Sequence, residues 1–125
     1  MTDDNPYLDK AWPTDISLSP NKAILTVTFD DGARFALDAE LLRVESPSAE
    51  VQGHGADQKT TPAGKRHVTI RDIRPVGHYA IRIGFSDGHD TGIFTWKTLY
   101  DYGTNHTAMM EAYIRRLADA GLSRD

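Results

Sequence analysis

Alternating apolar and polar residues on either side of Asp-Gly pairs constrain the fold of this chain more than any other feature. Apolar side chains occupy the odd positions from Ala23 to Phe29, and they return at residues 33, 35 and 37 after Asp30-Asp31-Gly32. A period of two is typical of a strand with one buried face, and Gly accepts the positive φ of a tight hairpin turn. The sequence therefore predicts a β-hairpin over residues 23–37.

A second hairpin is predicted from residues 66–74 and 78–86, which are joined by a Pro-Val-Gly turn. The side chains expected to face one way from its second strand are Tyr79, Ile81, Ile83 and Phe85. The alternation of the first strand breaks near Asp72, which indicates a bulge or a strand end. Residues 86–88 (SDG) predict another turn, and residues 93–99 lead into a short helical segment.

Helical spacing is found near the end of the chain. The apolar residues that recur at this spacing are Met110, Tyr113, Ile114 and Leu117. Thr104 or Asn105 can cap the helix, and Gly121 supplies a left-handed stop. Residues 38–65 lack a sustained apolar period and predict a long loop after a short helical turn.

These elements predict an α+β fold, in which a small antiparallel β-sheet built from two hairpins carries a short helix and a C-terminal helix packed on it. A chain of 125 residues has the size of one domain. We expect a mobile N-terminal arm at residues 1–11, the body of the domain at 12–103, and at 104–125 the C-terminal helix packed on the same domain.

Composition excludes several classes of chemistry and location. The chain has no cysteine, so disulfides, thiolate metal sites and cysteine nucleophiles are excluded. No apolar run approaches the ~20 residues that span a bilayer, and the acidic first ten residues do not resemble a signal peptide. We therefore expect a cytoplasmic location and no membrane partner.

The charge is distributed unevenly along the chain. Residues 1–58 sum to −7, residues 59–82 to +5 and residues 83–125 to −2. Arg71 and Arg82 are candidates for binding an acidic protein or ligand. The alternative is that these arginines pair with the acidic first half of the same chain on a solvated surface. A pI near 5.7 argues against a nucleic-acid partner.

No catalytic motif is found around the histidine and serine residues. None of the five histidines is followed two residues later by Asp or Glu, as a two-His, one-carboxylate iron site usually requires. Ser46, Ser48 and Ser86 lie in no nucleophile motif. We expect that the chain is not an enzyme.

Four ordered motifs, which lie in residues 12–16, 26–32, 40–43 and 87–96, resemble the gamma-butyrobetaine hydroxylase-like N-terminal domain family. Residues 46–55 resemble its short stand-alone bacterial members in particular. The resemblance covers residues 12–103 and implies a domain that, in the hydroxylases, precedes an iron and 2-oxoglutarate oxygenase domain.

The same resemblance implies a structural zinc site of three cysteines and one histidine. The histidine position corresponds to His89, whereas the cysteine positions correspond to Ser46, Ser48 and Val51. A hydroxyl is a poor zinc ligand and an isopropyl group is none. We therefore expect no cofactor, with zinc as the alternative.

The resulting expectation is a non-enzymatic module that binds a protein partner or assembles into a homo-oligomer. The partner-binding candidates are His54, Arg71, Arg82, His89 and Trp96. The alternative is a metal-binding accessory domain linked to 2-oxoglutarate oxygenase or iron–sulfur cluster chemistry, with His89 among the ligands.

Overall fold

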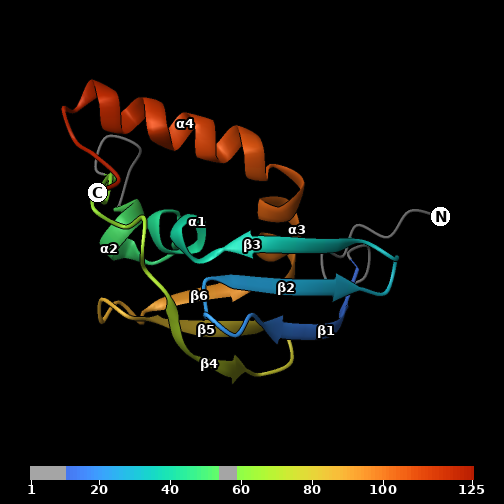
Figure 1. Ribbon diagram of the computed structural model, residues 1–125. Helices are drawn as coiled ribbons and strands as arrows, with labels where there is room; N and C mark the ends of the chain where they lie inside the picture. The colour runs from blue at the N-terminus through green and yellow to red at the C-terminus, as the bar shows by residue number, and fades with distance from the viewer. Residues whose placement is uncertain (1–10, 54–58) are drawn as a thin grey trace.

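The first of two antiparallel sheets contains the hairpin predicted at residues 23–37. The computed structural model describes residues 11–53 and 59–125. This sheet has the order β1-β2-β3, with β1 at Pro13–Leu18, β2 at Ile24–Phe29 and β3 at Arg34–Asp38 (Figure 1). Gly32 adopts a φ of +90° in the turn, which confirms the Asp-Gly prediction. The third strand, β1, was not predicted, because its residues alternate only weakly.

The second sheet has the order β4-β5-β6, with β4 at Ile70–Val76, β5 at Ala80–Phe85 and β6 at Gly92–Thr95. The register shifts between Ile70 and Asp72, which confirms the bulge predicted there. The hairpin turn lies at residues 77–79 and not at 75–77. Strand β4 is an edge strand and can continue through Pro75, because the missing N–H of a proline need not remove a hydrogen bond between strands there.

Tyr79 departs from the predicted alternation. Its side chain is exposed, whereas Ile81, Ile83 and Phe85 are buried. Tyr79 belongs to the turn, so the period of two begins only at Ala80. The expected four-residue apolar face therefore has three members.

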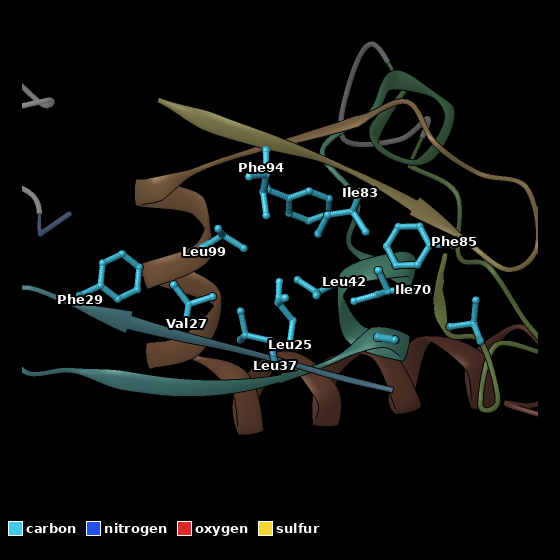
Figure 2. Packing of buried hydrophobic residues seen from close by; sticks show 13 residues of the cluster. Leu25, Val27, Phe29, Leu37, Leu42, Ile70, Ile83, Phe85, Phe94 and Leu99 are labelled. Carbon is cyan, nitrogen blue, oxygen red and sulfur yellow. The ribbon is translucent and has the colours of Figure 1, made fainter. Parts of the chain in front are cut away.

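The two sheets share one hydrophobic core, which Figure 2 shows from close by. Leu25, Val27 and Leu37 of the first sheet belong to the same cluster as Ile83 and Phe94 of the second, and all five are fully buried. Burial of this apolar area is the main favourable contribution to folding. The alternation read from the sequence correctly identified the inward face of each central strand.

Four helices are present in the described part of the chain: α1 (Ala39–Val44), α2 (Ala49–Gln52), α3 (Trp96–Thr104) and α4 (His106–Asp119). In Figure 1, α4 lies beyond α1 and β3, on the side away from the second sheet. Helix α1 lies where a short helical turn was predicted, whereas α2 lies in the segment expected to be a loop. No helix of the described residues is long and apolar enough to cross a membrane.

Helix α3 packs closely against β3. A Cβ atom at Gly103 would overlap the ring of Phe35. Phe35 in turn makes an edge-on contact with Tyr100, with ring centroids 5.1 Å apart. The absence of a side chain at position 103 therefore allows the helix to approach the strand.

Helix α4 is attached through its inward face and ends as predicted. Tyr113 is fully buried, and its hydroxyl donates to the carbonyl of Pro62. Gly121 has a φ of +68°, and the N–H of Leu122 donates to the carbonyl of Leu117 at 2.8 Å. This is the left-handed helix stop expected at Gly121. Ile114, by contrast, is exposed.

The predicted α+β class is confirmed, with two short sheets that each extend a predicted hairpin by one strand. The C-terminal helix is confirmed as well, and Asn105 precedes it. Residues 1–10, which make up most of the predicted arm, lie outside the described residues.

We expect Gly103→Ala to lower the free energy of unfolding by about 1–3 kcal/mol, because the added methyl group collides with Phe35. In an unobstructed helix the same change stabilises by about 1 kcal/mol. Urea unfolding of both proteins measures the difference. Thr107→Ala, at an exposed position of α4, serves as the control and should change stability little. A Gly103→Ala protein more stable than the wild type would contradict the proposed contact.

Candidate functional site

Ser46 and His89 meet in a buried polar corner, where the link between α1 and α2 contacts the turn between β5 and β6. The Nε2 atom of His89 lies 3.0 Å from the hydroxyl oxygen of Ser46. Ser46 is fully buried, and the side chain of His89 is 3% exposed. The structure thus brings together two positions that the family resemblance had singled out.

Local hydrogen bonds fix the Ser46 side of the corner. The side-chain amide of Gln52 donates to the carbonyl of Ser46 at 2.9 Å. The hydroxyl of Ser48 accepts from the backbone N–H of Glu50, which caps the first turn of α2. The backbone N–H of Ser48 points to the hydroxyl of Ser46 at 3.4 Å. Ser48 therefore has a capping role of its own.

The turn before His89 fixes the other side. Asp87 accepts from the backbone N–H of His89 at 3.1 Å, and Phe85 donates to the carbonyl of His89 at 2.9 Å. Gly92 then passes so close to Ser46 that a Cβ atom at position 92 would overlap the Ser46 hydroxyl. The contact between the two segments depends on a small residue at each of these positions.

Charged side chains surround the corner. Arg43 and Lys65 both contact Asp87, at 2.7 and 2.6 Å. Burial opposes ionisation of Asp87, but hydrogen bonds from Lys65, the His89 N–H and Arg43 outweigh it and lower the pKa of Asp87 to about 2. A double ion pair therefore joins α1 and the segment before β4 to the β5–β6 turn.

His89 is neutral near pH 7. Burial lowers the pKa of its imidazole, the positive charge of Arg43 lowers it further, and the carboxylates of Glu50 and Asp87 act in the opposite direction. A proton on Nδ1 faces Glu50 at 3.5 Å, which leaves Nε2 to accept from the Ser46 hydroxyl. A neutral ring with this tautomer satisfies both contacts.

Ser46, His89 and Glu50 thus adopt the order of a nucleophile, a base and an orienting acid. Glu50 is itself held by Thr91, whose hydroxyl donates to it at 2.7 Å. However, Ser46 has no exposed surface, so no substrate carbonyl can reach its oxygen in this conformation. The arrangement works as a structural hydrogen-bond chain.

The residues at the expected zinc positions do not fit a zinc ion. Ser46 is bonded to His89, Ser48 caps α2, and Val51 has no donor atom. A tetrahedral zinc site needs about four nitrogen, sulfur or carboxylate ligands. Among the described residues, no three His, Cys, Asp or Glu side chains are grouped to hold a metal ion.

A second feature, which we call the basic face, lies on the outer side of the second sheet. It consists of Arg71, Arg74, Arg82 and Ile93. Arg74, Arg82 and Ile93 are direct cross-strand partners, and all three are exposed. Residues on either side of them in the strands, such as Ile81 and Ile83, point into the core. Arg71 reaches the same side above Gly84.

The remaining candidates lie elsewhere. Trp96 is half-buried at the start of α3, and its indole N–H donates to the carbonyl of His78 at 2.8 Å. His54 lies outside the described residues. His89 was expected to contact a partner, but its ring is buried against Ser46 and is not presented at the surface.

Sequence reasoning missed Arg43, Glu50 and Arg74 as members of these features. Arg43 and Glu50 lie in the segment read as a loop, where no period placed them. Arg74 could have been found, because it is eight residues before Arg82 across a predicted hairpin.

A family model and several solved structures match this chain. Residues 16–100 match the family model described as gamma-butyrobetaine hydroxylase-like, N-terminal. One NMR solution structure is 44% identical over 99% of this chain and 90% of its own, with a TM-score of 0.81. A second is 42% identical over 92% and 90%, with a TM-score of 0.79. No curated protein matches the chain.

A crystal structure from Acidithiobacillus ferrooxidans is also similar. It is that of a protein of unknown function in the DUF971 family, and it is 40% identical to this chain. The match covers 70% of this chain and 86% of that one, with a TM-score of 0.58.

We expect the free energy of unfolding to fall as the pH drops below 6.5. In the unfolded chain, His89 binds a proton near its ordinary pKa of 6.5, whereas in the folded chain its pKa is lower and it binds a proton only at lower pH. One such proton contributes a slope of up to about 1.4 kcal/mol per pH unit. Urea unfolding between pH 7.5 and 5.0 should show a shallower slope for His89→Gln than for the wild type.

His67→Gln, which removes an exposed histidine, is the matched control and should keep the wild-type slope. Equal slopes for His89→Gln and the wild type would mean that the buried ring does not set this pH dependence.

Proposed function

The chain belongs to the gamma-butyrobetaine hydroxylase-like, N-terminal family, and from this premise we propose that it is a non-catalytic module that binds an acidic protein partner through the basic face. The observation that carries the proposal is the row of exposed arginines on the outer side of the second sheet.

The charge of the basic face comes from its three arginines, two of which lie near the carboxylate of Asp72. Asp72 lies 3.8 Å from Arg71 and 3.6 Å from Arg74, and these long contacts leave both guanidinium groups largely exposed. Arg82 makes no ion pair within the described residues. Guanidinium groups with unused donors suit the bidentate recognition of carboxylates.

An apolar residue completes the surface. Ile93 is 37% exposed and lies directly across from Arg82. An apolar contact beside charged groups is the composition of a recognition surface, in which burial supplies affinity and charge supplies specificity. The arginines stand on paired strands, so little conformational freedom of the backbone is lost on binding.

The chemistry of the corner supports a non-catalytic role. The Ser46 hydroxyl and the His89 ring are directed at one another and are closed to a substrate. A net charge of −4 and a pI near 5.7 do not favour a nucleic acid, because domains that bind the densely charged phosphate backbone are usually basic overall. We also propose that the module needs no cofactor, since the donor set of the corner does not suit a metal.

We expect Arg71→Glu/Arg82→Glu to weaken binding of the partner at least tenfold, which corresponds to about 1.4 kcal/mol. The partner is first captured on immobilised wild-type chain, then purified, and its affinity is measured at two salt concentrations. Arg34→Glu/Arg115→Glu carries the same charge change on exposed residues of β3 and α4 and should bind like the wild type.

Equal affinity of both double variants for the partner would show that the basic face does not bind it. A wild-type chain that sediments as a dimer, and becomes a monomer only in Arg71→Glu/Arg82→Glu, would identify a second copy of the chain as the partner.

For metal content, we expect elemental analysis of tag-free protein to give zinc and iron below about 0.1 ion per chain. His89→Ala should leave this baseline unchanged. Near-stoichiometric metal that is lost in His89→Ala would instead support the accessory metal-binding role.

A further inference from the structure

A cleft with both charged and apolar walls lies between the start of β2, the end of β3 and residues 66–68, and it shares no residue with the basic face. It has a volume of about 240 Å³ and is lined by Ile24, Asp38, Glu40, Arg66, Val68 and Arg124. One of these residues, Arg124, belongs to the segment at residues 122–125 that follows α4. Arg124 forms one wall of the cleft, and the segment is held there by contacts of the kind that a bound peptide makes.

Glu40 provides the specific contact. Its side chain is 6% exposed, and its two oxygens accept from Nε and Nη2 of Arg124 at 2.8 and 2.6 Å. A planar guanidinium matches a carboxylate in this two-pronged geometry, which an ammonium group cannot reproduce. A carboxylate so deeply buried is costly without a cation, so the cleft requires an arginine.

Backbone contacts hold the rest of the segment. The N–H of Gly64 donates to the carbonyl of Ser123 at 2.9 Å, and the N–H of Arg66 donates to the carbonyl of Arg124 at 3.0 Å. The guanidinium of Arg66 pairs with the carboxylate of Asp125. Two main-chain hydrogen bonds, with a charged side chain paired at each of the last two residues, fix the position of this segment against residues 64–66.

The segment is attached almost entirely by polar groups. Leu122 is 45% exposed, and the Asp125 side chain is 65% exposed. The connection to α4 passes through Gly121 in its left-handed conformation. With little apolar area buried, the segment can leave the cleft without disturbing the core.

From these contacts we infer that Glu40, Gly64 and Arg66, at the edge of this cleft, form a binding site for a peptide with an arginine followed by an acidic residue; residues 123–125 bind there intramolecularly, and the same motif of another polypeptide can replace them. Glu40 binds the arginine, Arg66 binds the acidic residue, and the N–H groups of residues 64 and 66 bind the backbone of the peptide. The site shares no residue with the basic face, so it can be tested independently of the proposed function.

The test uses the full chain with Arg124→Ala/Asp125→Ala and a fluorescein-labelled peptide, acetyl-Leu-Ser-Arg-Asp-amide. We expect fluorescence anisotropy to show binding at least about tenfold tighter to this variant than to the wild type, where the intramolecular segment competes. A peptide with Gln in place of Arg should bind at least about tenfold more weakly. Arg115→Ala/Asp119→Ala, with the same composition change on the exposed side of α4, should behave as the wild type.

Equal binding of the Arg and Gln peptides, or no binding to the folded Arg124→Ala/Asp125→Ala chain, would overturn the inference. If that variant does not fold, the inference is tested by titrating the wild-type chain with the two peptides. Excess Arg peptide should shift the amide resonances of Gly64 and Arg66, and the Gln peptide should not. Unmoved resonances at millimolar peptide would likewise overturn it.

Discussion

The hydrogen bond between the Ser46 hydroxyl and the His89 imidazole joins segments 43 residues apart, and the contact between these two segments depends on it. It connects the helical segment after the first sheet to the turn between β5 and β6. A neutral hydrogen bond of this kind contributes about 1 kcal/mol net, but an unpaired buried imidazole would cost about 1–3 kcal/mol. The arrangement is therefore held as much by the penalty for separation as by the bond itself.

The closed corner also directs recognition to other surfaces. Its titratable groups are satisfied internally: Asp87 by Arg43 and Lys65, and His89 by Ser46. Groups with unused bonding capacity lie instead on the outer side of the second sheet, while the cleft beside Glu40 already contains an arginine from the same chain. The fold thus separates an interior polar network from the two exterior sites for which we propose binding partners.

The sequence predicted those parts of the fold whose signals are local. Alternation and Asp-Gly turns identified both hairpins, and helical spacing with Gly121 identified α4. Strand β1 and the outward position of Tyr79 were missed, because they depend on which neighbour a residue meets and not on its own period. The same reason explains the site. Ser46 and His89 were singled out, but Glu50 and the pairing of Glu40 with Arg124 arise only when distant segments fold together.

The close approach of Gly92 to Ser46 has a consequence for how such chains diverge. Because no Cβ fits at position 92 while an oxygen occupies the neighbouring position, the two sites share one fixed volume. A lineage that places a side chain at position 92 must reduce residue 46, or else move the whole β5–β6 turn. The identity of residue 92 in a descendant therefore constrains what its residue 46 can be.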